Sequence, residues 1–201
     1  MTLVFSVLGA YLFGAIPTSY IVGRLARGID LREQGSKNLG ATNVFRVLGW
    51  RYAVPVAAFD ILKGALPVWL AVRWAPGPLW APLACGVAAV LGHVFSPYVG
   101  FRGGKGVATA AGVFLGFTPL AMLIALGVWA VTLWLSGYVS LSSIIAALSF
   151  PAWIAVTGGW RPVFWASIPV ALFIVYAHRA NLRRLFAGTE NRFRTRRGLA
   201  P

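Results

Sequence analysis

The polar side chains of this chain are concentrated in three short segments. One is a glycine cluster that holds a lysine and opens into an apolar stretch: Gly100-Phe101-Arg102-Gly103-Gly104-Lys105-Gly106-Val107-Ala108-Thr109. Unshielded backbone N–H groups, an ammonium and the positive end of a helix are features that bind phosphate. The segment is no nucleotide-binding P-loop, because Gly106 follows Lys105 where that motif needs Ser or Thr. A packing or hinge role for the glycines is the alternative.

The first polar segment in chain order, residues 33–46, offers hydroxyl, amide and guanidinium groups at helical spacing. Thr42 and Asn43 precede Arg46 by four and three residues, so a helix would place all three on one side. Ser36 and Asn38 come just before them and are residue types that cap helix N-termini, where they would suit an anionic oxygen. The alternative is an interfacial loop between two membrane spans.

The third segment begins with His178 and Asn181, which would share a helix face if the preceding helix continued through them. An imidazole and an amide at a membrane surface would serve to orient a substrate or to move a proton. Arg184 and Glu190 follow, and from residue 192 the chain is rich in arginine. We expect that tail to face lipid headgroups.

The composition indicates what kind of scaffold must position these segments. Of 201 residues, 59% are hydrophobic and 11% are charged, against about a quarter charged in a soluble domain. This excludes a soluble globular protein and intrinsic disorder, and a single cysteine, Cys85, excludes an intramolecular disulfide. The net charge of +14 would suggest nucleic acid in a soluble chain, but bases that flank membrane spans explain it, so no nucleic-acid partner is expected.

Apolar runs long enough to cross a bilayer core of roughly 30 Å recur along the chain. We predict spans at 3–22, 52–72, 79–98, 138–156 and 162–177, and two crossings within 107–135, which Pro119 divides. Seven crossings with the N-terminus outside leave fifteen of the eighteen Lys and Arg residues on the cytoplasmic side. Residues 107–117 are too short to span alone, so we expect their helix to begin within the glycine cluster.

The prediction is therefore an all-α integral membrane protein with about seven transmembrane helices, the N-terminus outside and the C-terminus cytoplasmic. We expect one membrane-embedded domain over residues 1–201, with cytoplasmic segments at 24–51, 100–109 and 178–192 and a basic tail at 192–201. The polar segments would then meet on one membrane face.

Two charged residues and a histidine lie within the apolar spans. Asp60 and Lys63 are three residues apart, which fits either an ion pair that faces the helix bundle or a role in a substrate channel. His93 ends the third span, where we expect it to support the glycine cluster by a hydrogen bond or to contact phosphate directly.

The three segments together resemble the acyl-phosphate:glycerol-3-phosphate acyltransferase family of bacterial membranes (PlsY-type). The stretches that carry the resemblance are Gly35-Ser36-x-Asn38-x-Gly40-Ala41-Thr42-Asn43-x-x-Arg46, Gly92-His93 through Gly103-Gly104-Lys105-Gly106-Val107-Ala108-Thr109, and His178-Arg179-x-Asn181-x-x-Arg184 with Gly188 and Glu190. The resemblance extends from Tyr11 to Phe193. Lys37, where the family commonly has glycine, Ser96 and Arg102 depart from the family pattern.

This resemblance implies an enzyme of the bacterial cytoplasmic (inner) membrane whose active site faces the cytoplasm. Such an enzyme transfers a fatty acyl group from acyl phosphate to the 1-hydroxyl of sn-glycerol 3-phosphate, giving lysophosphatidic acid and inorganic phosphate in the first acylation step of phospholipid biosynthesis. The residues suit this chemistry, because cationic, amide-rich segments lie beside spans where an alkyl tail stays in lipid. The implied partners are the two substrates, membrane lipids and an upstream enzyme that forms acyl phosphate.

Our hypothesis for catalysis is direct, metal-free transfer that depends on positioning and electrostatics. Ser36 and Lys105, with the loop amides, would hold acyl phosphate, and His178 would be the base unless a substrate phosphate takes the proton. The expected substrate-binding residues are Asn38, Thr42, Asn43, Arg46, His93, Gly103, Gly104, Gly106, Thr109, Asn181, Arg184 and Glu190. No cofactor is expected, because no His, Asp and Glu cluster has metal-ligand spacing.

A transporter or channel for an anionic phosphorylated solute is the alternative from another class, since it would also use basic segments and broken helices. The sequence favours the enzyme, because no motif is repeated between its halves and the polar segments lie on one membrane face. An acyl thioester donor, on coenzyme A or a carrier protein, stays open as a second alternative.

Overall fold

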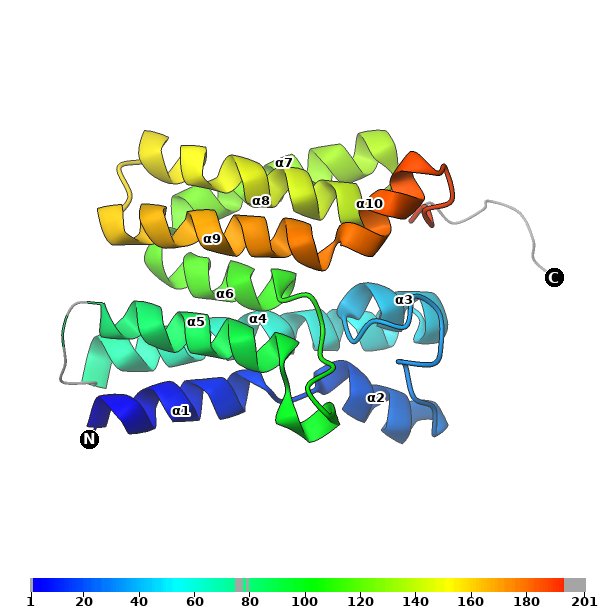
Figure 1. Ribbon diagram of the computed structural model, residues 1–201, viewed down its shortest axis with the longest axis horizontal. Helices are drawn as coiled ribbons and strands as arrows, with labels where there is room; N and C mark the ends of the chain where they lie inside the picture. Colours follow the sequence, from blue (N-terminus) through cyan, green and yellow to red (C-terminus); the bar gives the residue numbers. More distant parts are fainter. Residues whose placement is uncertain (1, 75–77, 79, 194–201) are drawn as a thin grey trace. The chain divides into compact units, whose positions relative to one another are not determined.

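The computed structural model describes residues 2–74, 78 and 80–193 of the 201-residue chain. Every regular element in this part is helical, which confirms the all-α prediction. The helices group into two compact units, Met1–Pro119 and Leu120–Pro201, each of which is described separately (Figure 1). The single domain stays a prediction, and the basic tail predicted at 192–201 lies outside the described residues from position 194 onward.

The first unit contains the first two polar segments. Its elements are α1 Thr2–Gly14, α2 Thr18–Arg27, α3 Ala41–Leu48, α4 Trp50–Trp74, α5 Ala81–Val94, the 3₁₀ turn η1 Pro97–Val99 and α6 Val107–Phe117. α1 packs along α5 in the same direction, because Ala10 clusters with Cys85 whereas Ala15 lies against Gly92 (Figure 1). A side chain at Gly92 would collide with the backbone of α1, so this contact requires glycine.

α4 runs against α5 and packs along α6. Asp60 faces His93 near the end of α5, whereas Val68 reaches Gly86 further back. The contact with α6 is close, because a Cβ at Gly112 would collide with the Ile61 carbonyl. Small residues allow such close backbone approach between membrane helices. This arrangement places the segment before α4 and the glycine cluster after α5 at the same end of the unit.

The first predicted span, at 3–22, is interrupted between α1 and α2. Residues 15–17 leave the helix, and their carbonyls need other donors inside an apolar environment. Ser96 Oγ donates to the Ala15 carbonyl at 2.6 Å, and Lys63 Nζ donates to the Ile16 carbonyl at 2.9 Å. The predicted span is supported, because Leu3–Arg27 is long and apolar enough to cross a membrane, and remote side chains stabilise the break within it.

The second unit contains the third polar segment. Its helices are α7 Pro119–Ser136, α8 Val139–Val156, α9 Arg161–Ala177 and α10 Arg179–Phe186. α7 begins at Pro119, as predicted. α8 packs on α9, and α10 contacts both. The chain bends by 56° between α9 and α10 at His178, so the helix does not continue straight through this residue.

Five helical stretches among the described residues are long and apolar enough to cross a membrane, and the bent pair α9 and α10 makes a sixth if it is one span. This confirms a multi-pass membrane protein. α6 has only 11 residues and begins at Val107, since Gly106 has a left-handed φ of 79° and ends the loop. The expectation that α6 reaches back into the glycine cluster is therefore wrong, while the count of seven and the orientation of the termini stay predictions.

Candidate active site

The glycine cluster folds back onto the end of α5. The Gly103 N–H donates to the Val94 carbonyl at 2.9 Å, and the Gly104 N–H donates to the His93 carbonyl at 3.1 Å. A Cβ at Gly104 would collide with the His93 ring and with the Leu39 carbonyl, so only glycine permits this approach. The structure thus brings the first two polar segments together at Leu39.

These hydrogen bonds change the expected role of the loop amides. The N–H groups of Gly103 and Gly104 donate hydrogen bonds to backbone carbonyls. The predicted phosphate contact through these two amides is therefore not supported. The first N–H groups of α6 have no partner within their own helix and lie directly after Lys105 and Gly106. The predicted phosphate contact therefore depends on the Lys105 ammonium and the N-terminus of α6, and it stays a prediction.

Thr109 lies away from this surface. Its side chain is fully buried at the contact between α6 and α4, where its backbone lies against Gly64. The hydroxyl oxygen of Thr109 has no hydrogen-bond partner among the described residues. Helix packing covers the side chain of Thr109, so its hydroxyl does not support substrate binding, and substrate binding by Thr109 stays a prediction.

Asn43 organises the first polar segment from beneath. It is 1% exposed, its Oδ1 accepts from the Ser36 N–H at 2.8 Å, and its Nδ2 donates to the carbonyls of Leu31 and Gln34 at 3.0 and 3.1 Å. All of these contacts are internal, so Asn43 positions Ser36 and does not itself face a ligand. The helix predicted around it is confirmed as α3.

Two further residues of this segment do not act as expected. α3 begins after Gly40, and no side chain caps its N-terminus, so Ser36 and Asn38 are not helix caps. Both side chains are half-buried in the preceding turn. Thr42 and Arg46, also half-buried, lie four residues apart on α3 and so share a face.

Lys37 has a φ of 58°, in the left-handed region that favours glycine. The family resemblance places a glycine at this position, and the backbone conformation gives the physical reason. Lys37 is exposed, so the chain accommodates its side chain in solvent at a cost in backbone strain.

An ion pair that sequence reasoning missed joins the first segment to the turn before the glycine cluster. Arg32 Nη2 lies 2.6 Å from Asp30 Oδ2, and Arg32 Nη1 donates to the Val99 carbonyl at 3.0 Å. The side-chain hydrogen bonds from Arg32 hold the pKa of Asp30 below its usual value, although burial opposes this effect. The only signal in the sequence was the close spacing of the two charges.

The intramembrane charges form an ion pair, which confirms one of the two interpretations of Asp60 and Lys63. Lys63 Nζ lies 2.7 Å from Asp60 Oδ1, and both side chains are buried. Thr18 Oγ1 donates to the same carboxylate oxygen at 3.1 Å. His93 Nδ1 is 3.9 Å from that oxygen, so His93 lies between the pair and the glycine cluster, as its predicted supporting role requires.

In the second unit, Glu190 is the centre of the polar segment. Its Oε1 accepts from Asn181 Nδ2 at 2.6 Å and from Ser140 Oγ at 2.8 Å, while its Oε2 accepts from Arg184 Nε at 2.7 Å. Burial alone would raise the pKa of Glu190, but the hydrogen bonds from these three donors outweigh it and hold the pKa below its usual value.

Glu190 therefore positions Asn181 and Arg184, and its two oxygens are occupied by protein donors. Direct substrate binding by Glu190, as predicted, is not supported by these contacts. Ser140 ties this segment to α8, and nothing in its sequence context within an apolar span indicated that role.

His178 lies at the bend between α9 and α10 and is buried. Its Nδ1 is 2.8 Å from the Ile174 carbonyl. Because a carbonyl oxygen only accepts, Nδ1 is the donor in this contact. The contact fixes the orientation of the imidazole ring at the bend.

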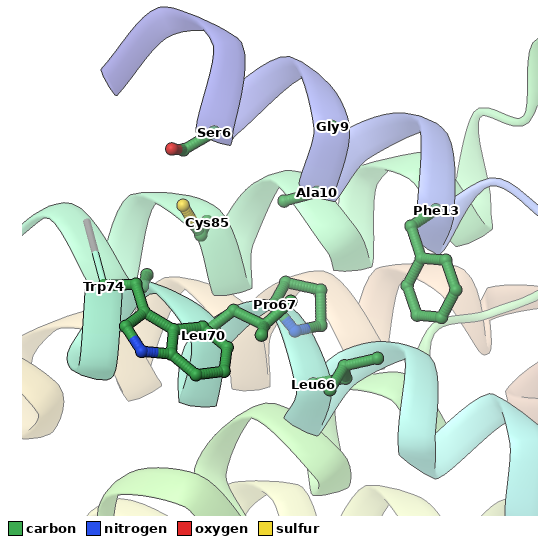
Figure 2. Close-up of a pocket in the computed structure, with 10 residues that line it drawn as sticks. Ser6, Gly9, Ala10, Phe13, Leu66, Pro67, Leu70, Trp74 and Cys85 are labelled. Carbon is green, nitrogen blue, oxygen red and sulfur yellow. The ribbon is translucent and has the colours of Figure 1, made fainter. Parts of the chain in front are cut away.

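An apolar groove of about 470 Å³ lies elsewhere in the first unit, where α1 and α4 meet the floor formed by α5 (Figure 2). Its walls are formed by Ser6, Gly9, Ala10, Phe13, Leu66, Pro67, Leu70, Ala71, Trp74 and Cys85. No charged side chain lines it, so the groove suits an alkyl chain rather than a phosphate. Cys85 precedes His93 by eight residues, about 12 Å along the helix, so the groove is separate from the glycine cluster.

A multi-pass helical protein with basic, amide-rich segments at its helix ends, and with a buried imidazole in one of them, has the features of a membrane-embedded enzyme for anionic substrates. Among the described residues, no three His, Cys, Asp or Glu side chains come close enough to hold a metal ion. The chain belongs to the glycerol-3-phosphate acyltransferase family, whose sequence model matches residues 4–188.

Individual relatives match along nearly their whole length. A glycerol-3-phosphate acyltransferase of Chlorobium luteolum is 42% identical over 227 residues, covering 96% of this chain and 97% of that protein. One of Geotalea daltonii is 45% identical over 188 residues, covering 94% of this chain and 96% of that protein.

The fold is also shared with a solved structure. The crystal structure of PlsY (YgiH), an integral membrane glycerol 3-phosphate acyltransferase, in its glycerol 3-phosphate form has a TM-score of 0.91 at 41% identity over 97% of both chains. The lysophosphatidic acid form of PlsY has a TM-score of 0.87 over the same coverage.

Proposed function

We propose that this protein transfers a fatty acyl group from acyl phosphate to the 1-hydroxyl of sn-glycerol 3-phosphate, releasing lysophosphatidic acid and inorganic phosphate. The observation that carries the proposal is the whole-length likeness to PlsY, an acyltransferase solved in a glycerol 3-phosphate form and a lysophosphatidic acid form. The reaction is the first acylation step of phospholipid biosynthesis. A transporter is not favoured, because the family and its relatives are acyltransferases.

The donor is held by the end of the first unit that carries the glycine cluster. The Lys105 ammonium, the N-terminal amides of α6 and the Ser36 hydroxyl bind the phosphate of acyl phosphate and stabilise its charge as it leaves. Asn43 supports this role by fixing the backbone of Ser36. Asn38 and Thr42, half-buried beside Ser36 in sequence, complete the polar surface.

The acceptor is oriented by Asn181 and His178 of the second unit. Its 1-hydroxyl oxygen attacks the acyl carbonyl carbon, the bond from that carbon to the phosphate oxygen breaks, and the hydroxyl proton moves to a base. The contact of Nδ1 with the Ile174 carbonyl, which orients the ring, supports His178 as that base. A substrate phosphate is the alternative proton acceptor, in which case His178 serves binding alone.

A kinetic series at His178 separates these two roles. If His178 is the base, His178→Ala lowers kcat strongly even at saturating glycerol 3-phosphate. A loss confined to KM for glycerol 3-phosphate would assign the proton to a substrate phosphate.

The protein lies in the bacterial inner membrane with its active site toward the cytoplasm. The positive-inside rule supports this orientation, since the basic segments 24–51 and 100–109 lie at the same end of the first unit. In this topology the short helix α6 is the fourth crossing along the chain and brings the total to seven. An upstream enzyme must form the acyl phosphate, because that mixed anhydride is too reactive to accumulate.

The donor class is tested with purified protein, glycerol 3-phosphate and one donor at a time: acyl phosphate, acyl-coenzyme A or acyl carrier protein. Lysophosphatidate is expected only with acyl phosphate. Product formation from a thioester with none from acyl phosphate would contradict the proposed donor.

A further inference from the structure

We infer that Asp60 and Lys63 are positioning residues for the glycine cluster. They act in two ways, by fixing the break between α1 and α2 and by supporting the His93 ring on which Gly104 rests. The inference rests on the proposed function, because it concerns how the phosphate-binding segment of that reaction is held.

The pair itself needs an explanation beyond stability. Lys63 and Asp60 are 1% and 2% exposed, and their charged atoms lie 2.7 Å apart inside α4. Removing two charges from water is costly, and well-packed apolar residues in their place are often no less stable. Charged residues within a membrane span are therefore functional candidates, and their contacts indicate which function.

The first set of contacts fixes the break in the first span. Lys63 Nζ donates to the Ile16 carbonyl at 2.9 Å, and Thr18 Oγ1 donates to Asp60 at 3.1 Å. Lys63 thus supplies a hydrogen-bond donor to a carbonyl in the break, while Asp60 accepts a hydrogen bond from the first turn of α2. The path of the chain into the first polar segment depends on both charges.

The second set of contacts leads to the glycine cluster. Nδ1 of His93 faces the Asp60 carboxylate at 3.9 Å, and its Nε2 lies so close to Gly104 that a Cβ there would collide with it. The His93 carbonyl also accepts the Gly104 N–H at 3.1 Å. His93 therefore joins the ion pair to Gly104 through its ring and its backbone, one residue before Lys105.

The small cavity beside the pair favours this positioning role over the other interpretation of the pair, a substrate channel. The cavity has a volume of only about 10 Å³ and is lined by Pro17, Thr18, Ser19, Leu39, Asp60, Lys63, His93, Gly103 and Gly104. A space of this size holds about one water molecule. Neither an acyl chain nor a phosphate group fits, so the pair acts on the site through its neighbours.

The test uses the double variant Asp60→Asn/Lys63→Met, because either single change would leave an unpaired charge in the membrane. Amide hydrogen exchange over residues 100–106 is measured together with kcat and KM for each substrate. We expect faster exchange in the loop, a fall in kcat of about tenfold or more from its misplacement, and little change in KM for glycerol 3-phosphate. His93→Gln is expected to accelerate exchange in the same residues.

Ser143→Ala is the matched control, since it removes the 3.2 Å hydrogen bond from Trp129 Nε1 between α7 and α8 and leaves the ion pair intact. It should leave exchange over 100–106 and kcat near the parental values. A folded double variant with parental loop exchange and parental kcat would overturn the inference, as would exchange that rises equally throughout α1–α6. A parent that makes no lysophosphatidate refutes the proposed function instead, and the exchange comparison still decides the positioning role.

Discussion

Glu190 accepts hydrogen bonds from Ser140 on α8 and from Asn181 and Arg184 on α10. Glu190→Gln replaces one acceptor oxygen by an NH₂ group that faces another donor. We expect the free energy of unfolding to fall by about 2 kcal/mol, since a buried donor then lacks its acceptor. Thermal unfolding in detergent measures the change, and an unaltered melting temperature would contradict this role.

The same residue predicts a pH dependence. The pKa of Glu190 is lower in the folded than in the unfolded chain, so its ionised form stabilises the fold above the ordinary value of 4.5. This contribution is lost as the pH falls toward the folded-state pKa. The stability difference between the parent and Glu190→Gln should therefore shrink in acid, and a difference that grows there would contradict the assignment.

Lys105 is the residue on which proposed donor binding depends most. Lys105→Ala removes a charge-assisted hydrogen bond to the leaving phosphate, and we expect turnover to fall by about a hundredfold. Lys105→Arg should rescue little, because a wide planar fork replaces a compact ammonium between Gly104 and Gly106, both of which are buried. The control is Arg183→Ala on the exposed surface of α10. A monodisperse Lys105→Ala protein with near-parental phosphate release would contradict donor binding by Lys105 and would leave the glycine cluster with a hinge role alone.

Lys37 offers a test of backbone strain within the first polar segment. Its φ of 58° costs a non-glycine residue about 1–2 kcal/mol, so Lys37→Gly should stabilise the protein by up to about 1 kcal/mol after the entropic cost of glycine. Glu33→Gly in the preceding turn, also at an exposed position, has no positive φ to relieve and should destabilise slightly. Equal effects of the two substitutions on the melting temperature would argue against strain at Lys37.

At the scale of elements, residue spacing and proline positions predicted the helices and helix boundaries that depend on neighbouring residues. The helix over Thr42 and Arg46 followed from spacing, and the boundary at Pro119 followed from the missing N–H of proline. The break between α1 and α2 carries the same kind of signal in Pro17, which the predicted span at 3–22 did not take into account, but the contacts that stabilise the break are remote. Its carbonyls are satisfied by Lys63 and Ser96, which lie 47 and 81 residues away along the chain.

The same distinction explains where the structure differs from the expectations for the candidate site. Thr109 was expected at the phosphate because it lies in the first turn of α6, but the packing of that helix on Gly64 buries it. Gly103 and Gly104 were expected to present free amides, but the fold of the loop onto α5 occupies both. Tertiary contacts of this kind leave no local pattern in a sequence.

The packing of α4 on α6 predicts the effect of a single methyl group. A Cβ at Gly112 would collide with the Ile61 carbonyl, so Gly112→Ala should destabilise the first unit by about 1–3 kcal/mol. Gly127→Ala in α7 is the matched control, because no atom lies within contact distance of its Cβ. Melting temperatures of the two variants that match each other would contradict the close packing.

At the scale of the whole molecule, composition established a membrane protein and charge distribution predicted its orientation, but neither identified a reaction. The reaction followed from three polar segments whose residues resemble one family, and the sequence and structural relatives confirm that family. The glycine cluster and the first polar segment meet at Leu39 and Gly104, which gives the resemblance a physical basis in the first unit.

The central claim is direct acyl transfer from acyl phosphate to glycerol 3-phosphate, and the balance of products tests it most directly. Purified protein is given both substrates, and lysophosphatidate and inorganic phosphate are measured over the same time course. We predict equimolar release of the two products, with no phosphate release when glycerol 3-phosphate is omitted. Phosphate release without lysophosphatidate, or an early excess of phosphate that leaves acyl groups on the protein, would contradict direct transfer.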